Sequence, residues 1–269
     1  MIEKTAQADF ERDGFINVHE VFQPSEIVDA RNELERLYRD FPVGTAARLV
    51  PYHPDGIDAG QARIDHPHLV SPLIDSLLRA PTFCDAVRSI LGVKTVQVWY
   101  CHALRKPGAT DSANHVGWHQ DGQYASFLTG SFITAWIPLV DIAADSSPLI
   151  YVSGSHRQGA LNGSGFSHKA TLEELKSSIL SHNRVEWRET IATGPAGFVS
   201  FHHSDVLHGS AGNEGGGVRY SIACHLRTER NRLLPENDYK DAVSQIRDTE
   251  LSPVVCGSVD ALDFGGVTA

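Results

Sequence analysis

A series of short segments rich in β-branched and aromatic residues fills the chain between residues 94 and 228, and it constrains the fold more than any other feature. Gly, Pro, Asn and Ser separate these segments, as expected for strands joined by turns. Strands at this spacing are typical of a sandwich or barrel, and a double-sheet jelly roll is one way to build it. The predicted strands are residues 94–105, 131–141, 148–154, 184–192, 196–203 and 217–227.

The part of the chain before residue 94 has a helical pattern instead. Residues 24–40 place apolar side chains at helical spacing after a Pro-Ser start, which predicts an amphipathic helix. Two shorter helices are predicted at residues 71–80 and 81–92, the second ending at Gly92. Residues 41–70 are rich in Pro, Gly and His and are predicted to form a long loop.

These patterns predict one domain over residues 1–269, mainly β with supporting helices. Residues 1–93 form its mostly helical support, residues 94–228 its jelly-roll core and residues 229–269 a C-terminal extension. A helical segment around residues 160–183 interrupts the strand series. It is predicted to be an insertion, at a position suited to cover the mouth of a cavity.

The charge balance narrows the possible partners. The net charge is −10, and no cluster of Lys and Arg is present, so nucleic acid is not an expected partner. No apolar run approaches the ~20 residues that a membrane span needs, and the polar N-terminus does not resemble a signal peptide. We therefore predict a soluble, cytoplasmic protein with no membrane partner; the sequence does not indicate an oligomeric state.

The four cysteines are scattered along the chain, and their spacing also favours a cytoplasmic location. Cys84, Cys101, Cys224 and Cys256 form no CxxC pair. This pattern favours buried thiols in a reducing cytosol over a disulfide framework or a thiolate zinc site.

The stretch NHVGWHQDGQY, residues 114–124, contains a possible metal-binding pair. On a strand, residues i and i+2 point to the same face, so His119 and Asp121 would lie side by side while Gln120 points away. Such a pair can occupy two adjacent positions on one metal ion. A solvated turn is the alternative interpretation of this stretch when it is taken alone.

A second stretch, FHHSDVLHGSAGNEGGGVRYSIACHL at residues 201–226, supplies what the first lacks. His208 as a third ligand would complete a set of two histidines and one carboxylate, which leaves three positions of an octahedral Fe(II) open. Those positions suit a bidentate 2-oxo acid and oxygen. Arg219 is suited to the far carboxylate of the acid, because a guanidinium makes a paired, charge-assisted contact, and Ser221 shares its strand face.

The segments FERDGFINVHEVFQPSEI, WHQD, ITAWIPLVD, SPLIYVSGSHRQG, FHHSDVLHGSAGN and RYSIACHL occur in this order over roughly residues 8–228. In this the chain resembles the phytanoyl-CoA dioxygenase-like family of Fe(II)- and 2-oxoglutarate-dependent oxygenases. The resemblance implies a double-stranded β-helix, a cupin-like jelly roll. It also implies that His119, Asp121 and His208 bind the catalytic iron and that Arg219 binds 2-oxoglutarate.

Further positions of the resemblance point to the co-substrate. Trp136 matches an aromatic position that lies against it in relatives, and Thr134 shares the same strand face, although both could equally be core residues. Tyr100, His102 and Lys106 alternate before the His-x-Asp pair, where relatives often supply polar contacts. The candidate cofactor-binding residues are therefore Arg219, Ser221, Trp136, Thr134, Tyr100 and His102.

Several other polar residues receive weaker assignments. Gln97 lies on the opposite face from the candidates if the strand alternates strictly, whereas a bulge would reverse this. Among the remaining histidines, His202, His203, His156 and His225 are expected to be surface or supporting groups, while His66, His68 and His115 are candidates for a substrate pocket.

The resemblance implies that 2-oxoglutarate and O2 are consumed, that succinate and CO2 are released, and that an unactivated C–H bond of a small-molecule substrate is hydroxylated. Natural-product biosynthesis is the expected setting, and residues 41–70, 106–117 and 155–183 are the expected pocket loops. Asp121 favours hydroxylation over halogenation. Desaturation, epoxidation and cyclisation stay open, as do a Zn- or Mn-dependent cupin isomerase or hydrolase and a binding or sensor module.

Overall fold

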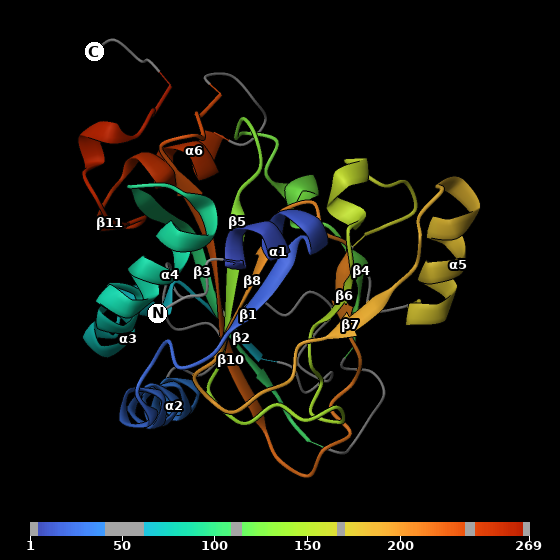
Figure 1. Cartoon of the computed structure of the whole chain (residues 1–269). Helices are drawn as coiled ribbons and strands as arrows, with labels where there is room; N and C mark the ends of the chain where they lie inside the picture. The colour runs from blue at the N-terminus through green and yellow to red at the C-terminus, as the bar shows by residue number, and fades with distance from the viewer. Residues whose placement is uncertain (1–4, 41–61, 109–114, 166–169, 235–239, 266–269) are drawn as a thin grey trace.

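Two antiparallel sheets and their supporting helices make up the computed structural model, which describes residues 5–40, 62–108, 115–165, 170–234 and 240–265 (Figure 1). The larger sheet has the order β1-β8-β5-β10-β3-β11, with β2 also paired to β3. Its strands are β1 (Phe15–Val18), β2 (Ala62–Asp65), β3 (Val96–Lys106), β5 (Ile133–Pro138), β8 (Val199–His203), β10 (Arg219–Thr228) and β11 (Val254–Cys256).

The smaller sheet has the order β4-β9-β6-β7 and is joined to the larger one by buried hydrogen bonds, such as that between Tyr151 and Ser200 at 2.8 Å. This arrangement confirms the predicted jelly roll. The N-terminal region also contributes β1 and β2, which the sequence did not predict as strands. The strands of the smaller sheet are β4 (Val116–His119), β6 (Ile150–Val152), β7 (Glu189–Ile191) and β9 (His208–Ser210).

Helices cover the outer face of the larger sheet, while α5 lies beside the smaller sheet (Figure 1). Ser71 caps α3 by accepting a hydrogen bond from the Ile74 backbone, and Thr171 with Glu174 forms a capping box on α5. The helices are α1 (Ala6–Asp13), α2 (Pro24–Asp40), α3 (Pro72–Leu78), α4 (Pro81–Leu91), α5 (Leu172–His182) and α6 (Lys240–Arg247). Among the described residues, no helix combines the length and apolarity needed to cross a membrane.

Strand β10 shows how the sequence separates the core from the site. Ile222, Cys224 and Leu226 belong to the apolar cluster that packs against the helices. Because neighbouring strand residues point to opposite faces, Arg219 and Ser221 point between the two sheets instead. The interior between the sheets is therefore lined by polar side chains even though it is buried.

A bulge at the β3–β10 pairing, between His225 and Leu226, places Gln97 opposite Arg227. The bulge, and not strict alternation, decides where Gln97 points. Its Oε1 accepts a 2.6 Å hydrogen bond from Arg227, and its Nε2 donates to the carbonyls of Ile246 and Ser252 at 2.8 and 2.6 Å. Gln97 thus anchors the C-terminal extension to the sheet.

The prediction of four free thiols is wrong for two of them, because Cys84 of α4 and Cys256 of β11 form a disulfide. They are 172 residues apart, so no local spacing could indicate the pairing. The fold brings them together by adding β11 to the edge of the larger sheet beside β3. Cys101 and Cys224 are free and buried. The cysteine pattern therefore no longer supports a cytosolic location.

Candidate metal and cofactor site

The structure brings His119, Asp121 and His208 together in the buried space between the sheets. One potential ligand atom from each lies within 4.8 Å of the others, and all three residues are buried. Asp121 Oδ1 is 3.6 Å from His119 Nε2 and 3.7 Å from His208 Nε2. Among the described residues this is the only such group of potential metal ligands.

The backbone geometry of the pair differs from the predicted strand. Strand β4 ends at His119, and Asp121 begins the 3-10 helix η4 (Asp121–Tyr124). Gln120, between them, points away and braces the turn: its Nε2 donates to the carbonyls of Gly159 and Asp205 at 2.8 and 2.7 Å. The carboxylate therefore reaches the histidines from a turn that the neighbouring segments hold in place.

Local hydrogen bonds orient both imidazoles. His119 Nδ1 lies 2.8 Å from the carbonyl oxygen of Gly117, and His208 Nδ1 lies 3.0 Å from that of Val206. A carbonyl only accepts, so each Nδ1 carries a proton and each Nε2 is turned toward Asp121. Burial, reinforced by His119, lowers the pKa of His208 well below its usual value.

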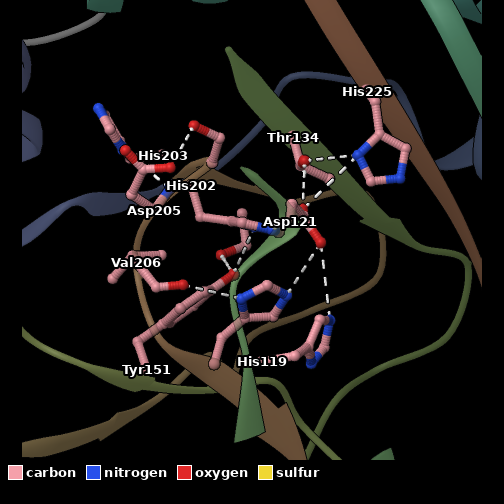
Figure 2. A network of polar contacts seen from close by, with 12 residues as sticks. His119, Asp121, Thr134, Tyr151, His202, His203, Asp205, Val206 and His225 are labelled. Atoms are coloured by element: carbon pink, nitrogen blue, oxygen red, sulfur yellow. Dashed lines mark hydrogen bonds and ion pairs between the residues drawn. The ribbon is translucent and has the colours of Figure 1, made fainter. Parts of the chain in front are cut away.

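Asp121 lies at the centre of a polar network (Figure 2). Burial alone would raise the pKa of its carboxyl group, but the surrounding histidines, His208 and His225 first, reverse this and hold it well below its usual range. An ionised carboxylate beside two Nε2 lone pairs is a donor set suited to a divalent transition metal.

A second cluster lies farther along the interior, where Arg219 of β10 and Lys106 of β3 occupy opposite positions on neighbouring strands. Both side chains are buried, at 2% and 0% exposure. Lys106 Nζ donates to Ser147 Oγ at 3.0 Å and Ser210 Oγ at 2.7 Å, and Arg219 Nη1 donates to the Ser147 carbonyl at 2.5 Å. Among the described residues neither cation contacts a carboxylate.

Burial lowers the pKa of Arg219 to about 10, and burial together with the Arg219 charge lowers that of Lys106 well below its usual value. Two cations held side by side in a buried space are costly unless an anion accompanies them. The cluster therefore has the charge and the burial of an anion site.

Unused hydrogen-bond donors mark the same place. Within the described part of the chain, Arg219 Nε, Ser221 Oγ and Trp136 Nε1 are buried without a hydrogen-bond partner. The Arg219 guanidinium lies over the Trp136 ring at 5.4 Å. Buried polar groups are normally paired, so donors left open next to two cations indicate the place of a bound acceptor.

Ser147, which accepts from both cations, has a φ of +57°. A non-glycine residue in the left-handed region is uncommon, and such residues often mark functional sites. Its hydroxyl also donates to the Ala211 carbonyl at 2.6 Å. The local structure thus holds Ser147 in an unfavourable conformation that presents two acceptors to the cations.

Both sheets connect the metal ligands to the cations over a short distance. On β9, His208 and Ser210 share a face, and on β5, Thr134 beside Asp121 shares a face with Trp136 beside Arg219. Two residues along a strand rise roughly 7 Å. This separation is comparable to the length of a five-carbon dicarboxylate.

The remaining cofactor candidates, Thr134, Tyr100 and His102, lie closer to the metal ligands than to Arg219 and Lys106. The Thr134 hydroxyl donates to Asp121 Oδ2 at 2.7 Å, and the Tyr100 hydroxyl donates to Asp65 at 2.5 Å. His102 lies beside Tyr100, with its Nδ1 buried and unpartnered among the described residues. These three side chains follow β5 and β3 beyond the metal ligands, away from Arg219.

The sequence predicted His202 to be a surface or supporting group and did not single out Ser147 or Ser210. His202 Nε2 lies 3.1 Å from Asp121 Oδ2. A turn after β8 ends that strand, so His202 and His208 belong to different sheets yet meet across the interior. Ser147 and Ser210 carried no local signal, because their roles depend on Lys106 reaching them from another strand.

The family model for phytanoyl-CoA dioxygenase matches residues 10–221, which include the three convergent ligands and Arg219. The chain belongs to the phytanoyl-CoA dioxygenase family. This confirms the recognition made from the motifs, together with the enzyme class and the iron and 2-oxoglutarate requirement of that class.

Two curated relatives are also named as dioxygenases. An ectoine dioxygenase from Bordetella parapertussis is 27% identical over 238 residues, which cover 84% of this chain and 75% of that protein. A probable alpha-ketoglutarate-dependent hypophosphite dioxygenase from Stutzerimonas stutzeri is 29% identical over 160 residues, which cover 56% of this chain and 51% of that protein. The chain thus spans about half the length of the second relative.

Solved structures share the fold. The non-heme monooxygenase ThoJ superposes with a TM-score of 0.69 at 22% identity, covering 94% of this chain and 84% of that one. The alpha-ketoglutarate-dependent epimerase SnoN from nogalamycin biosynthesis superposes with a TM-score of 0.66 at 20% identity, covering 88% and 86%.

Proposed function

We propose that this family member is a non-haem Fe(II)- and 2-oxoglutarate-dependent dioxygenase that hydroxylates an unactivated C–H bond of a small metabolite, with His119, Asp121 and His208 as its iron ligands. One observation carries the proposal. Three convergent metal ligands lie one short strand segment away from two buried cations, Lys106 and Arg219, that contact no carboxylate among the described residues. A metal site alone does not require those cations.

The residues present fit both groups. Two imidazoles and one carboxylate supply the donors that Fe(II) accepts, and they leave coordination positions for further ligands. Arg219 and Lys106 would bind the far carboxylate of 2-oxoglutarate, and Ser221 would donate its unused hydroxyl proton. Trp136 would lie against the bound acid, because its ring contacts the Arg219 guanidinium.

When bound, iron, 2-oxoglutarate and oxygen supply the oxidation, with succinate and CO2 as co-products. The chain's own share is to hold the donors and exclude water. His119 and His208 keep their Nε2 lone pairs directed inward through the carbonyls of Gly117 and Val206. The burial of every ligand limits the access of bulk water to the reacting centre.

Hydroxylation is favoured over halogenation because Asp121 retains the carboxylate. Ring closure and epimerisation are alternative outcomes with specific support, since neighbours in structure include a carbocyclase and an epimerase. Desaturation, epoxidation or ring closure would use the same ligands with a different placement of the substrate. A zinc- or manganese-dependent isomerase or hydrolase is disfavoured, because it leaves the buried cations without a role.

The proposed substrate is a small molecule of a biosynthetic pathway. Relatives named for ectoine and hypophosphite, and a neighbour solved with nogalamycin RO, support the size class and not its identity. We also propose that residues 1–269 act as a single oxygenase domain. A cytoplasmic location stays a prediction from the sequence alone, and the Cys84–Cys256 disulfide does not support it. Of the proposed pocket loops, residues 41–61, 109–114 and 166–169 lie outside the described residues.

Anaerobic spectroscopy tests the proposal. Adding 2-oxoglutarate to the Fe(II) protein is expected to produce a visible metal-to-ligand charge-transfer band, and oxygen with a candidate substrate is expected to yield succinate. The Asp121→Ala variant should show neither signal. A wild-type protein with no band and no succinate across a panel of small metabolites would contradict the proposal.

A further inference from the structure

The two carboxylate oxygens of Asp121 have different surroundings. Oδ1 faces the Nε2 atoms of His119 and His208 at 3.6 and 3.7 Å. Oδ2 faces away from them and contacts Thr134 Oγ1 at 2.7 Å and His202 Nε2 at 3.1 Å (Figure 2). One oxygen is thus directed to the metal position, and the other is held by protein donors.

Thr134 receives its direction from a further residue. Its hydroxyl has one proton, which is donated to Asp121 Oδ2, so its oxygen accepts from His225 Nδ1 at 2.9 Å. This arrangement requires the His225 tautomer that carries its proton on Nδ1. Thr134 is buried, at 2% exposure, so water cannot readily replace either contact.

His202 is oriented from the opposite side. With Nε2–H donating to Asp121, its Nδ1 accepts from the Tyr151 hydroxyl at 3.2 Å. Tyr151 in turn lies 2.8 Å from Ser200 Oγ, and its ring stacks on Phe15 at 4.4 Å. Burial raises the pKa of Tyr151, so the phenol keeps the proton that it donates.

From these contacts we propose that Thr134 and His202 are positioning residues that hold Asp121 as a single-oxygen metal ligand. Two donors occupy Oδ2, which prevents the carboxylate from turning both oxygens toward the metal. The positions left open by one-oxygen binding are those that a bidentate 2-oxo acid and oxygen need. The inference rests on the proposed function, in that it takes Asp121 to be a metal ligand.

Thr134 thus has a different role from the co-substrate contact that the family resemblance implies. Its single proton is engaged with Asp121 in the structure, so it is not available to donate to 2-oxoglutarate. His202 lies in the larger sheet and Asp121 follows the smaller one, so the contact also fixes the ligand across the interior.

Titration of the apoprotein with Co(II) tests the roles, because Co(II) reports affinity and coordination geometry through its visible bands without turnover. Thr134→Val and His202→Leu each remove a donor and are expected to weaken Co(II) binding about 10–100-fold and to change the visible spectrum. Thr134→Ser and His202→Gln keep a donor and should restore most of both properties.

Thr95→Val is the matched control, because Thr95 is as buried as Thr134, at 2% exposure, but lies before β3 and outside the network. It should bind Co(II) as the wild type does. Thermal unfolding of each apoprotein separates positioning from folding. Wild-type affinity and spectrum in both Thr134→Val and His202→Leu would overturn the inference, as would equal losses in the Val and Ser variants of Thr134.

The failure of the proposed function has a different signature. In that case the wild-type protein binds Co(II), yet the Fe(II) form gives no 2-oxoglutarate band and no succinate. The Thr134 and His202 variants that lack a donor would still bind Co(II) more weakly than those that keep one.

Discussion

The metal end and the cation end of the interior differ in how completely their polar groups are paired. At the metal end, Asp121 Oδ2 and the Nδ1 atoms of His119 and His208 have hydrogen-bond partners, so that Oδ1 and the two Nε2 atoms are directed to the metal position. At the cation end, Arg219 and Ser221 keep buried donors without partners among the described residues. The first end is arranged before any ligand binds, whereas the second requires a ligand to satisfy it.

Loss of a metal ligand should have the largest effect. Asp121→Ala removes the charged ligand together with the acceptor of two hydrogen bonds, so Fe(II) affinity and succinate formation should fall by more than the ~10–100-fold that loss of a supporting contact costs. Metal titration and a succinate assay measure this. An Asp121→Ala enzyme with near wild-type turnover would show that the metal end is not where the chemistry occurs.

Arg219→Met should separate the two ends. Truncating one member of a buried charge pair costs about 2–5 kcal/mol, or roughly 30-fold or more in affinity for 2-oxoglutarate. Co(II) affinity should stay unchanged, because Arg219 contacts no metal ligand. The apoprotein should unfold at a higher temperature than wild type, since an unpaired buried charge is removed. A drop in Co(II) affinity equal to the loss of 2-oxoglutarate affinity would refute the separation.

Lys106 should make 2-oxoglutarate binding depend on pH. Burial and Arg219 lower its pKa in the free protein, and a bound carboxylate would raise that pKa again. Binding is therefore expected to take up a proton and to weaken as pH rises through the lowered pKa. Calorimetry in buffers of different ionisation enthalpy measures the uptake, and Lys106→Met should abolish it. No uptake in the wild type would mean that Lys106 is already charged without a ligand.

The smallest expected effect concerns His66, beyond the metal end. Burial lowers its pKa from 6.5 to about 4, and its Nε2 accepts from Gln245 at 2.7 Å. Between these pH values the unfolded chain binds a proton that the folded protein excludes. The free energy of unfolding should thus fall with decreasing pH, by at most about 1.4 kcal/mol per unit from this residue.

Denaturant unfolding of the apoprotein at several pH values checks this prediction. His66→Asn, chosen because Asn tolerates the left-handed backbone at this position, should flatten the slope between pH 6.5 and 4. His182→Asn at an exposed position is the control. Equal slopes in wild type and His66→Asn would show that His66 is not the group responsible.

Local pattern was sufficient for much of the fold. The helix predicted over residues 24–40 matches α2, and the predicted strands overlap β3, β5, β6, β7, β8 and β10. Short elements such as β1, β2 and β11 were missed because they gain their stability by pairing with β8 or β3, and pairing leaves little trace in a segment of three or four residues.

Within the candidate site, residues with distinctive chemistry were found and residues with ordinary chemistry were not. The His-x-Asp pair, His208 and Arg219 are each recognisable in the sequence. The structure brings His119, Asp121 and His208 together. Ser147 presents its hydroxyl and its carbonyl to the cations through a backbone conformation that no residue type encodes. The face of Gln97 depends on a bulge one step along β3, so strict alternation could not place it.

The disulfide between Cys84 and Cys256 closes a covalent ring that contains every residue assigned to the metal or the cofactor. A protease that cuts one loop inside this ring, such as the one between β9 and β10, would open the ring without releasing a fragment. The two pieces would stay linked by sulfur, with His119 and Asp121 on one and Arg219 on the other. Such a nick would appear on a gel only after reduction.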